Sequence, residues 1–324
     1  MKKIVTIGSA TQDIFIYTKP GDVPREERNG TAFVLFEEGS KIAVQNLHYA
    51  TGGGAINAAA ALTLLEHTAI PVCKIAYDTA GDFIVNDLKK RGIATDHVCF
   101  TSSAPTAISF VLPSPTGNRA ILAHRGANGT IEQKDIPFDL IEKSDGVYIT
   151  SLSGDASELF PRIAQHAHKH NVMVAANPTK SQLINGAVNL QAALPYVHVF
   201  ILNESEARLL YTSLQPKKSF TIEEYCNFML QQGPSIVVVT SGASGVHVAA
   251  KENNKIKIYY QKTESVKVVN TVGAGDAFGS CFFGMLMHGA TIEKALKCGL
   301  MNSASLLTGR DTKEKLLTRA ELEN

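Results

Sequence analysis

The sequence lacks an excess of charge of either sign and any apolar run long enough to span a bilayer. Its 324 residues include 31 Lys and Arg against 30 Asp and Glu, so nothing favours a nucleic-acid or anionic-membrane partner. The apolar run after Met1-Lys2-Lys3 is too short for a signal peptide and is soon interrupted by Asp13. We therefore expect a cytoplasmic protein, either an enzyme acting on small molecules or a soluble scaffold.

Closely spaced cysteine pairs are also missing. The five cysteines lie mostly in apolar stretches, which predicts reduced core residues and excludes a disulfide framework or a zinc site. The ten histidines show no metal-ligand spacing, and we assign none of them a catalytic role. Internal repeats and low-complexity tracts are absent, so the length allows one large α/β domain or two of average size.

Apolar strand patterns alternate with helical patterns through the middle and the end of the chain. The predicted strands are 146–150, 172–176, 197–202 and 236–240, and the helices between them are 158–169, 204–211 and 222–232. Nearly continuous apolar strands indicate a parallel sheet that is covered on both faces. We predict an α/β fold, a doubly wound, mostly parallel sheet flanked by helices, with ligands at the C-terminal ends of its strands.

A glycine loop near the C-terminus ends on one aspartate. The run 266–269 reads as a strand, and a helix is expected over 277–287. Gly273 and Gly275 have no Cβ, so their amides can approach an anion at a helix start, where the helix dipole favours phosphate. Phosphate would repel the carboxylate of Asp276, so we assign Asp276 to the other reactant, a hydroxyl that it would deprotonate for attack on phosphorus.

Two regions interrupt the strand-helix alternation. Half-buried strand patterns occur at 14–17, 32–36, 42–47, 106–112 and 119–124, and 114–118 is a strong hairpin signal. We predict one domain over 1–324 with a small antiparallel β lid formed by about 14–48 and 99–125. A lid that excludes water suits phosphoryl transfer, whereas a decorated sheet edge is the alternative.

A second glycine cluster opens a helix that runs to about residue 65. Amides near Gly53 and Gly54 could bind polyol hydroxyls or an anion, and Asn57 could donate and accept hydrogen bonds. Small residues that merely let the helix pack on the sheet would explain the same pattern. Asp13, at the end of the first strand, could accept hydrogen bonds from neighbouring sugar hydroxyls or could cap a turn.

Several polar residues follow later strands. Asn203 and Glu206 could form a helix capping box or could orient waters around a magnesium ion. Six further positions are candidates for the site. A nucleotide contact at Thr240, Gly242 and Gly245 competes with a glycine-rich turn, and one at Asn302 competes with a helix-surface or capping amide. Asn177 follows the strand 172–176 at its C-terminal end, and a substrate contact at Arg125 competes with a solvated arginine.

Together these motifs resemble the ribokinase-like, or phosphofructokinase-B, family of sugar kinases. The segment 270–276, Asn-Thr-Val-Gly-Ala-Gly-Asp, is similar to the family signature D-T-x-G-A-G-D. The segment 53–59 resembles the N-terminal signature, and Asn203 with Glu206 matches the motif N-x-x-E. The resemblance covers the chain from Asp13 to about Thr308.

The resemblance implies a kinase that uses ATP and Mg²⁺ to phosphorylate a hydroxymethyl group of a sugar or nucleoside. Asp276 would be the general base, and the amides of Gly273, Ala274, Gly275 and Asp276 would form an anion hole. Asp13, Gly53, Gly54 and Asn57 would hold the substrate. Glu206 would hold magnesium through water, and the nucleotide site would include Asn177, Asn203, Thr240, Gly242, Gly245 and Asn302. In this family the lid often joins a homodimer.

Two departures from the family pattern stand out. Asn270 replaces the first aspartate of the signature, which in relatives helps to bind an activating monovalent cation. The missing carboxylate weakens the attraction for potassium and puts cation activation in doubt. The segment 309–313 lacks the usual glycine-alanine turn, so the boundary of the nucleotide pocket is less clear.

Two alternatives remain at this point. A non-catalytic regulator on the same fold would bind the sugar or nucleotide without turnover, although the presence of Asp276 argues against it. A dinucleotide-dependent oxidoreductase would need its glycine fingerprint in the first βα turn, whereas the glycines Gly273, Gly275 and Gly279 lie near the C-terminus. Ribose, fructose, a sugar phosphate and adenosine all stay open as substrates.

Overall fold

The computed structural model describes residues 1–19, 21–29, 31–114, 119–185, 187–253 and 255–323. Within these ranges a nine-stranded sheet has the order β15-β14-β13-β12-β11-β10-β1-β6-β7. In this order the strands from β13 to β7 are parallel, and β14 and β15 form an antiparallel edge. The strands are β1 Lys3–Ile7, β6 Thr68–Ala76, β7 Val98–Thr101, β10 Gly146–Ile149, β11 Met173–Ala176, β12 Val199–Asn203, β13 Ile236–Thr240, β14 Val246–Glu252 and β15 Lys255–Gln261. The predicted doubly wound, mostly parallel sheet is therefore confirmed.

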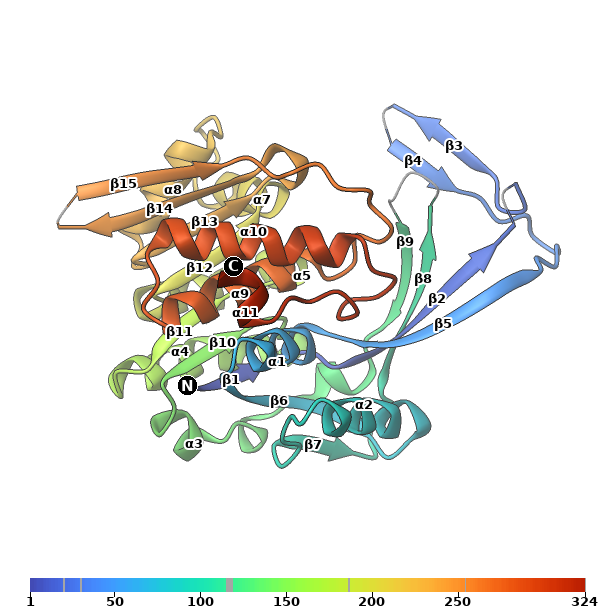
Figure 1. Ribbon diagram of the computed structural model, residues 1–324, viewed down its shortest axis with the longest axis horizontal. Helices are drawn as coiled ribbons and strands as arrows, with labels where there is room; N and C mark the ends of the chain where they lie inside the picture. Colours follow the sequence, from blue (N-terminus) through green and yellow to red (C-terminus); the bar gives the residue numbers. More distant parts are fainter. Residues whose placement is uncertain (20, 30, 115–118, 186, 254, 324) are drawn as a thin grey trace.

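Helices cover both faces of this sheet (Figure 1). One face packs against α1 Gly54–Leu64, α2 Thr79–Lys90, α9 Ala274–Met287, α10 Ile292–Leu307 and α11 Arg319–Glu323. The other packs against α3 Phe138–Glu142, α4 Leu159–Lys169, α5 Lys180–Asn185, α6 Ala187–Ala193, α7 Glu204–Leu214 and α8 Ile222–Gln231. The central strands β1, β10 and β11 are almost fully buried because each side of the sheet faces a helix layer.

A smaller sheet projects from the main body on the right of Figure 1. Its order is β5-β2-β8-β9, with β2 Thr11–Thr18, β5 Val44–Gly52, β8 Ala107–Pro113 and β9 Arg119–His124. The outer pairs are antiparallel, as expected, but the central pair, β2 with β8, is parallel. We call this four-stranded sheet the lid. A separate ribbon, β3 Arg25–Arg28 with β4 Thr31–Val34, lies beyond it.

The predicted boundaries of the lid need correction. Residues 99–101 belong to β7 and pair with β6 at the edge of the main sheet, so they are not part of the lid. The strand predicted at 32–36 pairs with β3 and does not join the lid sheet. Most of the hairpin turn predicted at 114–118 lies outside the described residues.

The strand predicted at 266–269 is wrong. This segment has no regular secondary structure, and the side chains of Val268 and Val269 are 40% and 43% exposed. The amide of Val269 donates to the carbonyl of Leu307 at the end of α10. Its backbone therefore bonds to the end of a helix, whereas a β-strand would have to bond to a neighbouring strand. The following helix, α9, starts at Ala274, three residues before its predicted start, so Asp276 lies inside its first turn.

Of the described cysteines, four are buried and Cys99 is half-buried, and all five are free thiols, as predicted. Among the described residues, no helix is both long and apolar enough to cross a membrane.

Candidate active site

Two neighbouring cavities meet at the start of α9. The lid cavity, about 250 Å³, lies under the lid and is lined by residues that include Asp13, Asn57 and Ser109. The strand-end cavity, about 290 Å³, lies at the C-terminal ends of β10 through β13 and includes Asn177, Asn203 and Thr240. The residues that line both cavities are Ser9, Ser151, Gly273 and Asp276.

Gly273 gives α9 its open N-terminus. It takes a left-handed φ of 82° at the N-cap position, and a Cβ there would lie 2.9 Å from Thr312 Cβ. Without a side chain to cap the helix, the leading amides of α9 stay available, since the first intrahelical bond runs from Ala277 N to Gly273 O at 2.8 Å. Ala274 and Gly275 also line the strand-end cavity, next to which the anion-hole prediction needs the leading amides of α9.

The carboxylate of Asp276 is held by Asn57. The Nδ2 atom of Asn57 donates to Asp276 Oδ2 at 2.8 Å. Burial raises the pKa of Asp276, and the hydrogen bond from Asn57 and the positive charge of Lys313 partly oppose this rise. A carboxylate with a raised pKa is a better proton acceptor, which is what a general base needs.

Asp13 lies in β2 of the lid and not at the end of the first main-sheet strand, where the sequence analysis placed it. The chain leaves β1 at Gly8 and crosses directly into the lid, so Asp13 pairs in register with Ala50 and Ser109. The side chain of Asp13 is 5% exposed and accepts a hydrogen bond from Ser109 Oγ. Burial raises its pKa, while Ser109 and the charge of Lys313 act in the opposite direction.

The glycine cluster before α1 packs closely against the chain after β1 and also lines the two cavities. Gly53 has φ 91°, and a Cβ there would lie 2.4 Å from the carbonyl oxygen of Ser9, so only glycine fits. Gly53 also lines the lid cavity, and Gly54 lines the strand-end cavity. The close packing of α1 therefore brings the start of this helix to the site.

Lys313 is a site residue that the sequence analysis missed. It is 4% exposed, and its Nζ donates to Thr51 O, to Thr312 Oγ1 at 2.9 Å and to Asn57 Oδ1 at 3.2 Å. Thr312 Oγ1 also donates to Asn57 Oδ1 at 3.0 Å, so the amide oxygen of Asn57 is fixed and its NH₂ group must face Asp276. Burial lowers the pKa of Lys313 to about 8.

Asn203 and Glu206 form the predicted capping box and also face the strand-end cavity. Asn203 Oδ1 accepts from Glu206 N at 2.9 Å, and Glu206 Oε2 accepts from Asn203 N at 3.1 Å. Burial raises the pKa of Glu206. In the same cavity, Asn177 Nδ2 donates to Tyr148 Oη at 3.4 Å, which leaves its oxygen side for a ligand.

Three predicted nucleotide residues lie outside both cavities. Gly242 and Gly245 sit in the turn between β13 and β14, where a Cβ on Gly245 would lie 2.4 Å from Gln261 O. Asn302 is buried in α10, donates to Ala277 O at 2.9 Å and accepts from Leu317 N at 2.8 Å. The contacts of Asn302 fit a structural amide that joins α9 to the C-terminal segment. Arg125, by contrast, lines the lid cavity as predicted.

Asn270 ties the loop before α9 to the C-terminal segment. Its Nδ2 donates to Arg310 O at 3.2 Å, and its Oδ1 accepts from Val272 N at 3.0 Å. A carboxylate at this position could not donate to a carbonyl. The contacts of Asn270 are therefore neutral hydrogen bonds that need an amide.

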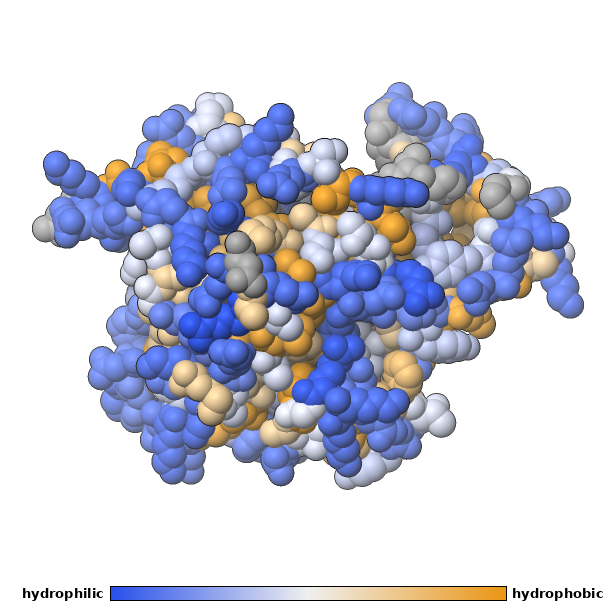
Figure 2. Space-filling view, viewed as in Figure 1, coloured by the Kyte–Doolittle hydropathy of each residue, from blue (hydrophilic) through white to orange (hydrophobic). Residues whose placement is uncertain are grey.

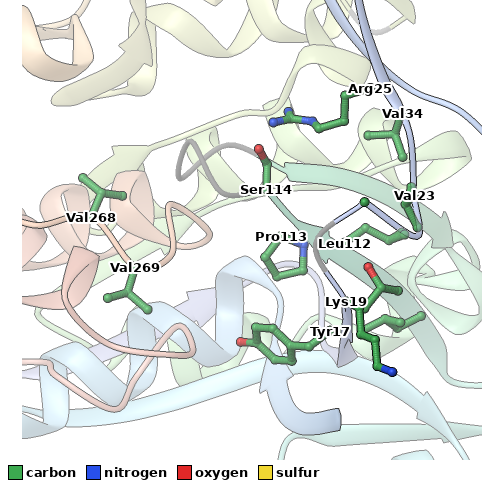
Figure 3. Close-up of a pocket in the computed structure, with 13 residues that line it drawn as sticks. Tyr17, Lys19, Val23, Arg25, Val34, Leu112, Pro113, Ser114, Val268 and Val269 are labelled. Atoms are coloured by element: carbon green, nitrogen blue, oxygen red, sulfur yellow. The ribbon is translucent and has the colours of Figure 1, made fainter. Parts of the chain in front are cut away.

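A further hollow of about 420 Å³ opens at the outer end of the lid (Figure 3). Figure 3 shows Tyr17, Leu112 and Pro113 on one side of it and Val268 and Val269 on the other. Figure 2 shows a mostly hydrophilic surface on this face of the molecule, with apolar groups near the junction of the main body and the lid. None of the predicted site residues is among the described residues that line this hollow.

Known sugar and nucleoside kinases are similar to this chain in sequence and in fold. The ribokinase of Staphylococcus aureus (strain COL) is 26% identical over 316 residues, 94% of this chain and 93% of the relative. The adenosine kinase of Schizosaccharomyces pombe (strain 972 / ATCC 24843) is 25% identical over 268 residues, 78% of this chain and 77% of the relative. The structure of Arabidopsis thaliana ribokinase complexed with ribose and ATP superposes with a TM-score of 0.79 at 21% identity, covering 99% of this chain and 97% of that one.

The last comparison establishes the fold, and the relatives are kinases of a sugar and of a nucleoside. A family model described as pfkB family carbohydrate kinase matches residues 1–318. The chain therefore belongs to the pfkB family of carbohydrate kinases and is a kinase of a carbohydrate or a nucleoside.

Proposed function

We propose that the protein transfers the γ-phosphoryl group of ATP to a hydroxymethyl group of a sugar, with Asp276 as general base. One observation carries the proposal, namely that Asp276 and Gly273 line both cavities. A phosphoryl group that moves from a nucleotide to an acceptor must pass the point where the two binding sites meet. The sugar would occupy the lid cavity and ATP the strand-end cavity.

The chemistry needs one proton transfer and one displacement. The acceptor hydroxyl gives its proton to the Asp276 carboxylate while its oxygen bonds to the γ-phosphorus, and the bond from that phosphorus to the bridging oxygen of ADP breaks. The amides of Gly273, Ala274, Gly275 and Asp276 would stabilise the charge on the transferring group. Asn57, fixed by Thr312 and Lys313, keeps the base in position.

The lining of the lid cavity favours a sugar over a nucleoside. Its described lining residues include hydroxyls, amides and two carboxylates but no Phe, Tyr or Trp on which a base could stack. Asp13, Asn57 and Asp276 provide the paired acceptors and donors that suit neighbouring hydroxyls. Arg125 and His124 also line this cavity and would suit a sugar that already carries a phosphate.

Magnesium and ATP fit the strand-end cavity. Glu206 offers one carboxylate beside the open amides of α9, which suits an ion that keeps most of its waters. Asn177, Asn203 and Thr240 would contact the nucleotide, whereas Gly242, Gly245 and Asn302 could contribute only from outside the cavity lining. Because the Asn270 amide already donates to Arg310 O, we propose no strong requirement for a monovalent cation.

We also propose that residues 1–324 act as one domain and that the lid joins two copies. The register places Tyr49, Ile14, Phe110 and Leu122 in one row across the four strands, on the face opposite Asp13 and Phe15. Tyr49, Phe110 and Leu122 are 50%, 39% and 61% exposed. Covering this exposed apolar row with the same row of a second copy would bury apolar surface and so stabilise a symmetric dimer.

An ADP-release assay tests the function directly. Ribose, fructose, their phosphates and adenosine would be offered with ATP and Mg²⁺, with Asp276→Asn as the inactive reference. Turnover with one sugar that disappears in the variant supports the proposal. Adenosine as the preferred acceptor would overturn the choice of a sugar, and binding of sugar and ATP without turnover would favour a regulator.

A further inference from the structure

A cluster of ligating side chains lies at the junction of α3 and α4. Glu142 is the last residue of α3, His166 is in the last turn of α4, and His170 is the C-cap of α4. His166 Nε2 lies 3.1 Å from Glu142 Oε1, and His170 Nε2 lies 3.6 Å from the same oxygen. One ligand atom from each residue lies within 4.8 Å of the other two. The sequence analysis found no metal-ligand spacing among the histidines, and it overlooked this pair.

We propose that Glu142, His166 and His170 bind a divalent first-row transition-metal ion, with Zn²⁺ as the representative ion. Histidines four residues apart lie on the same helix face, so both rings can reach one ion. Tetrahedral zinc with ligands at about 2.0–2.1 Å has neighbouring ligand atoms about 3.3 Å apart. The two distances to Glu142 Oε1 lie on either side of that value, so small side-chain rotations would complete the site.

The local chemistry favours an ion over a set of simple ion pairs. The Nε2 atom of His166 is buried and has no hydrogen-bond partner among the described residues, although it lies 3.1 Å from Glu142 Oε1. The rings of His166 and His170 stack with centroids 4.8 Å apart, so one ion could contact both. A divalent ion bound there would also balance the charge of the single carboxylate, Glu142.

The donor set also selects the class of ion. Two imidazole nitrogens and one carboxylate oxygen suit Zn²⁺, Co²⁺ or Ni²⁺, whereas Mg²⁺ and Ca²⁺ prefer ligand sets made of oxygen. The three side chains are 25–35% exposed, which leaves a path for the ion and room for water as further ligands. The edge of the Phe138 ring packs against His166 with centroids 4.8 Å apart and limits its rotation.

The proposed metal site is separate from the catalytic one. The helix α4 runs back along the sheet after β10, so its C-terminal end lies at the opposite sheet edge from the strand-end cavity. Figure 1 shows α3 and α4 at the lower left and the lid on the right. A metal ion there would join the ends of α3 and α4, and we expect it to stabilise the fold without entering the phosphoryl transfer.

Titration of the full-length protein tests the site. After treatment with a chelator, the protein would be titrated with ZnCl₂ by calorimetry and with CoCl₂ by visible absorption, with excess Mg²⁺ present to occupy other sites. We expect about one ion per chain, a d–d absorption spectrum of nitrogen-ligated cobalt, and a Zn²⁺-dependent rise in Tm. Failure of the wild-type protein to bind Zn²⁺ in this assay would overturn the proposal.

Single variants identify the ligands. His166→Ala, His170→Ala and Glu142→Gln should each weaken Zn²⁺ binding by at least about 10-fold. His168→Ala is the matched control, since His168 is on the same helix but contacts the rings of Tyr196 and His198. Equal loss in His168→Ala, or unchanged binding in the three ligand variants, would place the ion elsewhere. Kinase turnover of the variants, measured with chelator-treated protein, reports on the catalytic site independently.

Discussion

Two helices of this protein begin at the same cavity and begin in different ways. The helix α7 starts at Asn203, whose side chain and that of Glu206 satisfy each other's backbone amides. The helix α9 starts at Gly273, which has no side chain and turns through a left-handed φ of 82°. The leading amides of α7 are therefore partly used by its own residues, whereas those of α9 remain free for a ligand.

This difference suggests separate roles for the two helix starts. The capped helix places Glu206 in the lining of the strand-end cavity, where under the proposed function it would face a hydrated cation. The uncapped helix has Asp276 in its first turn, and under the proposed function its amides would face the phosphoryl group and Asp276 would face the acceptor. If the comparison holds, changes at the start of α9 should affect the chemistry, and changes at the start of α7 should affect mainly stability and nucleotide binding.

Asp276→Asn should have the largest effect. The substitution keeps the size and the fold but removes the proton acceptor, so turnover should fall by at least about 100-fold. The assay is ADP release under saturating ATP and sugar, together with a thermal melt. Glu204→Gln is the control, because Glu204 lies in the first turn of α7 and lines neither cavity. A similar loss of turnover in both variants would argue against Asp276 as the base.

Gly273→Ala should come next. Its Cβ would lie 2.9 Å from Thr312 Cβ in a left-handed conformation, a strain of about 1–3 kcal/mol that should displace the amides of α9. We expect a lower Tm and about a 10-fold lower kcat. Gly275→Ala is the matched comparison, since its Cβ would meet no atom within 4 Å and its φ is not positive. Unchanged kcat in Gly273→Ala would show that these amides do not form the anion hole.

The start of α9 was predictable because its parts are contiguous in sequence. The glycine loop and the acid follow one another within 270–276, and a helix start that could bind an anion needs only local geometry. The same locality explains the error at 266–269, since valines indicate a strand but do not say whether a neighbouring strand exists. The fold class was predictable for a further reason, the repeated alternation of apolar strands and helices.

Contacts that join distant parts of the chain were not predictable. Lys313 reaches Asn57 across 256 positions, and Ser109 reaches Asp13 across 96. A lysine near the C-terminus carries no local sign of burial, because lysine is usually exposed. The role of Asn302 was open for the same reason, and only its two partners show that it joins α9 to the C-terminal segment.

The pH dependence of activity in Lys313→Met tests the electrostatic effect of Lys313 on Asp276. The positive charge of Lys313 lowers the pKa of Asp276, so removing it should raise that pKa and move the acidic limb of the kcat/KM profile to higher pH. Loss of the hydrogen bond to Asn57 Oδ1 should also reduce kcat/KM, by about 10-fold near neutral pH. The full pH profile of both proteins is the measurement, and an acidic limb that does not move would contradict the electrostatic role.

The pH dependence of stability in the wild-type protein and in Lys313→Met gives an independent check of the burial of Lys313. The pKa of Lys313 is lowered from 10.5 to about 8 by burial, so above pH 8 the folded protein binds fewer protons than the unfolded chain. The free energy of unfolding should therefore rise between about pH 8 and pH 10.5 in the wild-type protein relative to Lys313→Met. Lys315→Met, at an exposed position two residues away, should follow the wild-type curve.

Asn203→Ala should have the smallest effect on turnover and so tests the other side of the comparison. Loss of the cap should lower the free energy of unfolding by about 1 kcal/mol. KM for ATP should rise a few-fold, because Asn203 and Glu206 line the strand-end cavity, whereas kcat should change little. Calorimetric melts and initial rates at varied ATP separate the two quantities.

Thr221→Ala provides the control for that variant. Thr221 caps α8 by accepting from Glu224 N at 3.1 Å and lines neither cavity, so its loss should cost similar stability with no change in KM. A rise in KM for ATP in Asn203→Ala alone would assign the cap of α7 to nucleotide binding. If kcat in Asn203→Ala falls as much as in Gly273→Ala, both helix starts contribute to phosphoryl transfer. A loss of kcat that came only from lower stability would also appear in Thr221→Ala.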